Sequence, residues 1–78
     1  MYNEEKMQQR LRNLREESNL NQYELAKKIG VNHCTICAYE TGSRLPKIDI
    51  LDAIADFYGV SIDWLTGRTD KKIPRTEG

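Results

Sequence analysis

The stretch with the most reactive side chains runs from residue 30 to residue 42 and reads GVNHCTICAYETG. It holds the only histidine of the chain, His33, followed by the only two cysteines, Cys34 and Cys37. Imidazole and thiol groups at this spacing could bind zinc, form a redox-active disulfide or act as an oxidation-sensitive switch. Each of these chemistries requires further residues, and the rest of the sequence decides among them.

A structural zinc site needs four ligands, usually two Cys or His pairs, whereas this chain offers one pair and its adjacent histidine. A Cys-x-x-Cys redox centre normally begins a helix that follows a strand, and no stretch here alternates long enough to predict a strand. We therefore expect no metal site and no redox centre. A thiol switch stays open, because exposed thiols at a helix N-terminus ionise more easily. We also expect no enzyme, because no nucleophile–base constellation and no phosphate-binding glycine loop is present.

Length and composition predict one small globular domain. The chain has 78 residues, of which 31% are charged and 38% hydrophobic, values that are ordinary for a soluble protein. No apolar run approaches the ~18 residues of a membrane span, and the N-terminal residues lack the apolar stretch of a secretory signal. We expect a cytoplasmic protein with free thiols, no cofactor, no membrane partner and no small-molecule substrate.

The net charge is zero, but the charges are segregated along the chain. Residues 6–47 contain eight basic and four acidic residues, giving +4, and residues 48–66 contain four acidic and no basic residues, giving −4. Such asymmetry can mark a binding face. The alternative is a set of solvated surfaces that segregate without a function.

Apolar residues at helical spacing predict five short helices. The expected ranges are 4–18, 22–29, 33–41, 48–58 and a last helix that begins at Ser61 and ends at Leu65. Only GVN separates the second helix from the third, and a short glycine-containing turn between two brief helices is typical of a helix-turn-helix. Residues 68–78 are polar and aperiodic, which predicts a flexible tail. The expected core consists of Leu11, Leu14, Leu20, Leu25, Ile29, Ile36, Leu51, Ile54, Val60 and Leu65.

The third helix has two different faces at 100° per residue. Ile36, Tyr39 and Glu40 fall on one side, which we expect to point inward. The opposite side is small and flat, with His33 at its N-terminal edge, and it contains Cys34, Cys37, Ala38 and Thr41. A slim helix face of this kind fits the major groove of DNA.

The stretch LNQYELAKKIGVNHCTICAYETGSRLP resembles the helix-turn-helix of the Cro and phage-repressor family, also called the xenobiotic response element family. Twelve residues match the family pattern in register: Leu20, Gln22, Glu24, Leu25, Ala26, Gly30, Val31, Thr35, Ile36, Tyr39, Glu40 and Gly42. The ending LDAIADFYGVSIDWLTGRTD is similar to the closing helices of the family, so the resemblance covers residues 11–70.

The resemblance implies an all-α, lambda-repressor-like DNA-binding domain over residues 1–67, with the helix-turn-helix at 22–41. It implies a bacterial or phage-encoded transcriptional regulator that binds double-stranded DNA sequence-specifically. We expect a repressor that reads a pseudo-palindromic operator as a homodimer. The alternative is a protein-interaction module such as an antitoxin or an accessory regulator.

The resemblance also assigns roles to single residues. Gln22 would meet a DNA phosphate, helped by the helix N-terminus. Thr35 would donate to a phosphate or lie under the turn, and Tyr23 and Lys27 would contact the backbone or face solvent. Arg15 and Glu40 would form a structural pair between the first and third helices. The base-facing positions would be His33, Cys34, Cys37 and Ala38, and the loop contacts to the backbone or minor groove would be Arg44 and Lys47.

Overall fold

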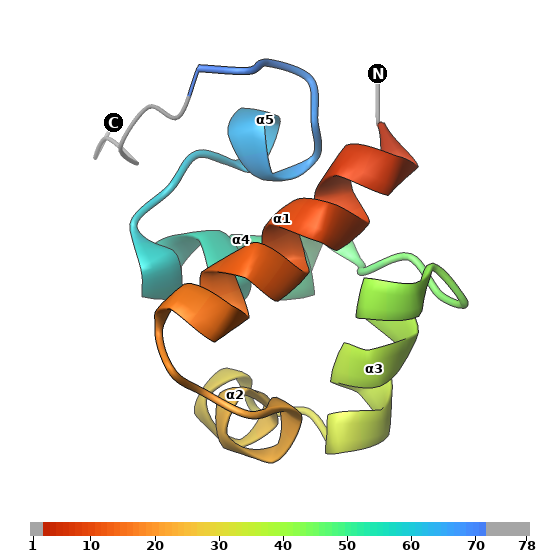
Figure 1. Ribbon diagram of the computed structural model, residues 1–78, viewed down its shortest axis with the longest axis vertical. Helices are drawn as coiled ribbons and strands as arrows, with labels where there is room; N and C mark the ends of the chain where they lie inside the picture. The colour runs from red at the N-terminus through yellow and green to blue at the C-terminus, as the bar shows by residue number, and fades with distance from the viewer. Residues whose placement is uncertain (1–2, 72–78) are drawn as a thin grey trace.

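The computed structural model describes residues 3–71 of the protein, and this part is all-α without a β-strand. The helices, shown in Figure 1, are α1 (Glu4–Glu17), α2 (Gln22–Ile29), α3 (His33–Thr41), α4 (Ile48–Tyr58) and α5 (Ile62–Leu65). The number of helices in the described part and nearly all their bounds agree with the sequence prediction. One difference is Ser18, which caps the C-terminus of α1 and is not its last residue.

Asparagine and serine side chains start four of the five helices that are described. Asn3 accepts a hydrogen bond from the N–H of Lys6 and begins α1. Asn21 and Glu24 form a capping box at α2, because each side chain accepts from the other residue's backbone N–H. The analogous caps of α3 and α5 are Asn32 and Ser61. Such caps stabilise a helix end by about 0.5–2 kcal/mol each, which explains why short helices begin at these residues.

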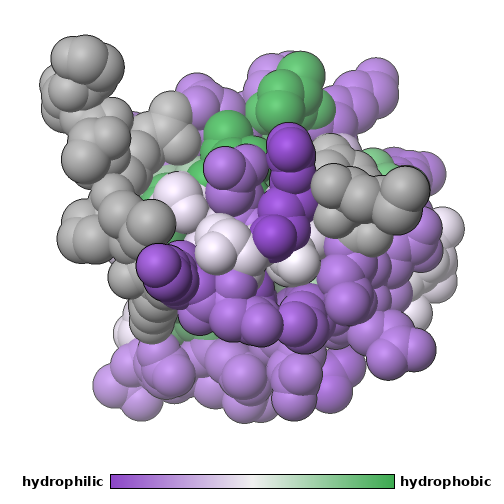
Figure 2. All heavy atoms as spheres, turned by 90° about the horizontal axis from the view of Figure 1, so that it is seen from above, coloured by the Kyte–Doolittle hydropathy of each residue, from purple (hydrophilic) through white to green (hydrophobic). Residues whose placement is uncertain are grey.

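The helix-turn-helix lies at one end of the molecule. In Figure 1, α1 crosses the middle, α2 and α3 lie below it, and α5 lies at the opposite end. α3 packs against both α2 and α1, while α5 packs against α1 and α4. The face seen from above in Figure 2 is mostly hydrophilic, and its hydrophobic side chains are most visible toward the upper edge.

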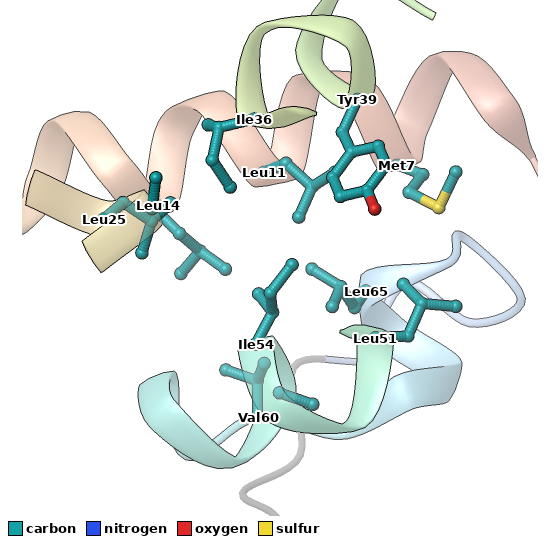
Figure 3. Packing of buried hydrophobic residues seen from close by; sticks show 12 residues of the cluster. Met7, Leu11, Leu14, Leu25, Ile36, Tyr39, Leu51, Ile54, Val60 and Leu65 are labelled. Atoms are coloured by element: carbon teal, nitrogen blue, oxygen red, sulfur yellow. The ribbon is translucent and has the colours of Figure 1, made fainter. Parts of the chain in front are cut away.

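The core is built from the inner sides of all five helices (Figure 3). Met7, Leu51 and Leu65 are completely buried. The prediction was wrong for Leu20 and Ile29, which are only partly buried and pack against the edge of the core. Leu20 precedes α2 and Ile29 is the last residue of α2, so both lie beside the turns that border this helix. Four further hydrophobic residues are buried in the core, namely Met7, Ala26, Ala55 and Tyr39, of which Tyr39 was expected to point inward.

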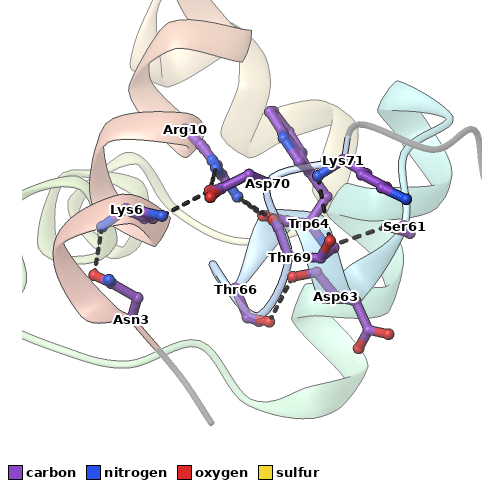
Figure 4. Close-up of polar contacts among 10 residues, drawn as sticks. All are labelled: Asn3, Lys6, Arg10, Ser61, Asp63, Trp64, Thr66, Thr69, Asp70 and Lys71. Carbon is purple, nitrogen blue, oxygen red and sulfur yellow. Dashed lines mark hydrogen bonds and ion pairs between the residues drawn. The ribbon is translucent and has the colours of Figure 1, made fainter.

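A polar cluster holds the segment after α5 against α1 (Figure 4). Arg10 donates through Nη1 to the carbonyl oxygens of Trp64 and Thr69, and its guanidinium lies 4.7 Å from the centre of the Trp64 ring. Asp70 accepts from Lys6 Nζ at 2.6 Å and from Arg10 Nη2 at 2.9 Å. These contacts extend beyond residue 68, where the flexible tail was expected to begin. Residues 72–78 of that predicted tail lie outside the described residues.

The contacts of Asp70 in this cluster should lower the pKa of its carboxyl group. Hydrogen bonds from Lys6 and then Arg10 hold the pKa of its carboxyl below the ordinary value of 3.8. A carboxyl with a lowered pKa in the folded state contributes stability above its unfolded pKa, and loses it as the pH falls through the folded value. We expect a carbon-13 NMR titration of the Asp70 carboxyl to have its midpoint below 3.8. The Lys6→Ala variant should raise this midpoint, and an unchanged midpoint would contradict the contact.

Gly67 makes the turn after α5 possible, with a φ of +81° that favours glycine. A Cβ at Gly67 would lie 2.7 Å from Asn3 Cβ and 3.2 Å from the Asn3 backbone oxygen. We expect Gly67→Ala to lower the free energy of unfolding by about 2–4 kcal/mol, combining the left-handed backbone with overpacking. The control is Gly59→Ala, at φ +67° with no atom within 4 Å of the added Cβ, where we expect only about 1–2 kcal/mol. Equal losses in urea unfolding would show that the close approach to Asn3 costs nothing.

Candidate nucleic-acid interface

The turn between α2 and α3 has the tight geometry that the sequence predicts. Gly30 adopts a φ of +94° and its N–H donates to the carbonyl oxygen of Ala26 at 2.8 Å. The N–H of Val31 donates to the same oxygen at 3.0 Å. Asn32 then begins α3 by accepting from the N–H and the hydroxyl of Thr35, both at 3.1 Å. The Thr35 hydroxyl is thus engaged with the N-terminal cap of α3, and its contact with a phosphate stays a prediction.

α3 presents a small, uncharged face to solvent. Cys34 and Thr41 are exposed, and His33, Cys37 and Ala38 are half-buried. The opposite side carries Ile36, Tyr39 and Glu40, which are all buried. Glu40 is the only Asp, Glu, Lys or Arg in α3. The two faces therefore divide as the helical spacing indicated.

The reactive side chains of the opening motif are not arranged as a metal centre. Both cysteines are free thiols. His33 Nε2 lies 3.6 Å from Cys34 Sγ. Within residues 3–71, no group of three His, Cys, Asp or Glu side chains is placed to hold a metal ion.

Tyr23 and His33 form an aromatic stack across the helix-turn-helix. Their ring centres are 3.9 Å apart and the ring planes differ by 20°. Tyr23 is 65% exposed, so the stack lies at the surface. Both residues were expected at the interface, but their contact was not predicted from the sequence. The two residues are ten positions apart in the sequence and lie on different helices. The angle between these helices cannot be predicted from the spacing of apolar residues.

Exposed basic side chains precede and follow α3 in the sequence. Lys27 and Lys28 are exposed on α2, and Arg44 and Lys47 are exposed in the loop after α3. The backbone N–H of Arg44 donates to the Ala38 carbonyl oxygen at 3.3 Å, which keeps the start of this loop against the end of α3. The segments on either side of α3 in the sequence thus carry exposed positive charge, which can attract a polyanion.

A buried carboxylate connects α1, α2 and α3. Glu40, with a 3% exposed side chain, accepts from Arg15 Nε at 2.6 Å and from Arg15 Nη2 at 3.1 Å. Gln22 Nε2 donates to the same carboxylate at 3.2 Å, and Arg15 Nη1 donates to the Leu20 carbonyl oxygen at 3.0 Å. The hydrogen bond to Glu40 raises the pKa of Arg15 above its ordinary value, although burial opposes this shift. The network fixes the angle of α3 and also engages the amide nitrogen of Gln22, the residue expected at a phosphate.

The same arrangement is found in known proteins. The sequence profile of a family described as Helix-turn-helix matches residues 11–65, which is more than half of the chain. The chain belongs to this helix-turn-helix family. The resemblance to Cro and phage repressors that the twelve matching residues indicated is therefore confirmed.

The relatives of this helix-turn-helix chain include regulators of bacteria and phages. It is 41% identical over 69 residues to the HTH-type transcriptional regulator YobD of Bacillus subtilis, covering 88% of this chain and 62% of that protein. It is 42% identical over 64 residues to the transcriptional repressor RstR of the cryptic phage CTXphi in Vibrio cholerae, covering 82% and 58%. The chain thus spans about three fifths of the length of these two relatives.

Solved structures confirm the lambda-repressor-like class of this helix-turn-helix fold. The P22 c2 repressor, crystallised with a synthetic operator, superposes with a TM-score of 0.75 at 28% identity, over 78% of this chain and 92% of that one. The DNA-binding domain of the same repressor in solution gives a TM-score of 0.73 at 29% identity, over 83% and 87%. In the described part of this helix-turn-helix chain, no helix is long and apolar enough to span a bilayer.

Proposed function

We propose that the protein binds double-stranded DNA sequence-specifically and regulates transcription as a repressor. The observation that carries this proposal is the outer face of α3, which is at least partly exposed and lacks Asp, Glu, Lys and Arg, together with exposed basic side chains in α2 and in the following loop. Base edges in the major groove are read by short polar and apolar side chains, while phosphates are met by lysine and arginine. The P22 c2 repressor, which shares this fold, was crystallised with an operator.

The roles proposed for the residues follow from their positions. His33, Cys34, Cys37 and Ala38 face the bases from the outer side of α3. Phosphates are met by side chains around α3, and Thr35 supports the turn. The proposed phosphate contacts are Gln22, Tyr23, Lys27, Arg44 and Lys47.

Two subunits would bind one operator. A chain without net charge brings few phosphate contacts, and a second copy doubles them. In this proposal residues 1–67 form the DNA-binding domain, and the protein acts in the cytoplasm by binding and not by catalysis. A pseudo-palindromic operator would have half-sites about one helical turn apart.

The proposal is tested by selecting DNA sites from a random pool and titrating the affinity for the selected site with salt. We expect a clearly negative slope of log K against log salt, since each neutralised phosphate releases counterions. Arg44→Ala and Lys47→Ala should each reduce the slope by about one per subunit and weaken all sequences alike. Lys71→Ala, an exposed lysine in the segment that follows α5, is the matched control and should leave the slope unchanged.

The same measurements can refute the proposal. If no site is selected, or if the slope is zero, the protein does not bind DNA as proposed. Capture of a neighbouring gene product by a chain that selects no DNA site would instead favour the antitoxin or accessory-regulator alternative. Sedimentation equilibrium with and without the selected site tests the dimer, and a single subunit on the full operator would contradict it.

A further inference from the structure

The Tyr23–His33 stack holds the first residue of α3 in a fixed orientation. A separation of 3.9 Å between ring centres and an angle of 20° between planes place the two rings in parallel contact, slightly closer than the range of about 4.5–7 Å that is common for aromatic pairs. The edge of the imidazole is also in contact, because His33 Nε2 lies 3.6 Å from Cys34 Sγ. One ring face and one ring nitrogen are thereby engaged within the protein itself.

A histidine at the first helical position would otherwise sample several rotamers. Immobilising such a side chain only on binding opposes the association by an amount that corresponds to about a two- to tenfold loss in affinity. A ring that is already ordered avoids this loss. The order also restricts which base edge the imidazole can meet, because its plane is set by the tyrosine ring and not by the DNA.

We propose that Tyr23 is a specificity-determining positioning residue, which acts through His33 by stacking on its ring before DNA is bound. This inference rests on the proposed function, because it concerns how the outer face of α3 selects a base. It differs from the phosphate contact proposed for Tyr23 above, which would use the hydroxyl group. The stack needs the aromatic ring, whereas a phosphate contact needs the hydroxyl.

The stack itself can be tested in the protein without DNA. His33 is the only histidine, so its two imidazole C–H protons can be assigned in a proton NMR spectrum directly. We expect both signals to lie upfield of an unstacked histidine because of the ring current of Tyr23. Tyr23→Leu should return them toward the unstacked position, whereas Tyr23→Phe should keep them upfield. The control is Phe57→Leu, which removes another exposed aromatic ring, one that packs edge-on against Tyr58 in α4, and it should leave both signals unchanged.

The effect on specificity is tested by site selection and by affinities for the selected site and its single-base variants. We expect Tyr23→Leu to relax the base preference at one position of each half-site, the position that His33→Ala also relaxes. The ratio of affinities for the preferred and the other bases at this position should fall about two- to tenfold. Tyr23→Phe should keep this ratio, and Phe57→Leu should keep it as well. In a His33→Ala background, Tyr23→Leu should cause no further loss of preference there.

The outcomes separate this inference from the function on which it rests. If the unchanged protein selects no DNA site, the proposed function is wrong and the inference falls with it. If the protein selects a site whose base preferences survive in Tyr23→Leu, the function stands and the positioning role is overturned. A uniform loss of affinity in both Tyr23→Phe and Tyr23→Leu, with base preferences intact, would instead assign Tyr23 to a phosphate.

Discussion

Replacing Arg15 with alanine is expected to lower the free energy of unfolding by about 3–5 kcal/mol. The loss arises because the Glu40 carboxylate, whose side chain is 3% exposed, would keep its charge in the interior without its main partner. Arg15 supplies two hydrogen bonds to this carboxylate, and Gln22 supplies one that is longer, at 3.2 Å. A domain of this size has a total stability of roughly 4–12 kcal/mol, so the variant should lose a large fraction of its stability.

Urea unfolding followed by far-UV circular dichroism measures this loss. Arg12→Ala is the matched control, because Arg12 is an exposed arginine on the same helix, and we expect a change within about 0.5 kcal/mol. A double variant, Arg15→Ala with Glu40→Ala, should lose less than the sum of the two single variants, because it leaves no buried charge unpaired. An additive double variant, or an Arg15→Ala variant as stable as Arg12→Ala, would show that the pair does not stabilise the fold.

The Leu51→Ala variant is expected to lose about 2–5 kcal/mol by the same measurement. Leu51 lies on α4, is completely buried and belongs to the cluster that all five described helices share. Figure 3 shows it on the side of the core that also holds Met7 and Leu65. Removing three carbon atoms there leaves a cavity between helices that are distant in the sequence, and the short α5 has few other contacts with which to compensate.

Leu45→Ala is the control for this prediction, because Leu45 is 43% exposed in the loop before α4. We expect it to change the free energy of unfolding by less than about 0.5 kcal/mol. Leu51→Met, which nearly preserves volume, should cost less than about 1.5 kcal/mol. If Leu45→Ala were as destabilising as Leu51→Ala, the burial of Leu51 would not be the source of the stability.

Helix positions could be predicted from the sequence because their signals are local. Asn21 with Glu24 forms a capping box within four residues, and Gly30 ends the helix directly after its last apolar residue, Ile29. Such contacts involve neighbours in the chain, so spacing alone indicates them. The degree of burial was less predictable. Leu20 and Ile29 are apolar, but Leu20 precedes α2 and Ile29 is the last residue of α2, and both are only partly buried.

The contacts that the sequence analysis did not predict join distant residues. The stack of Tyr23 on His33 depends on the angle between α2 and α3. The hydrogen bonds from Arg10 to Thr69 and Asp70 depend on how the segment after α5 packs against α1. Polar contacts of this second kind have no hydrophobic period, so residues 68–70 resembled a free tail. Within the candidate interface, the faces of α3 could be predicted from helical spacing, whereas the orientation of the His33 ring could not.

The outer face of α3 has no Asp, Glu, Lys or Arg, because Glu40, the only such residue of the helix, is buried. If the proposed function is correct, the segments that attract the phosphates, α2 and the loop after α3, differ from the segment that selects the base sequence, the outer face of α3. A gene duplicate could acquire a new target through a few substitutions at exposed α3 positions while retaining its hold on nucleic acid throughout. Divergence of such regulators would then proceed without an intermediate that has lost all affinity.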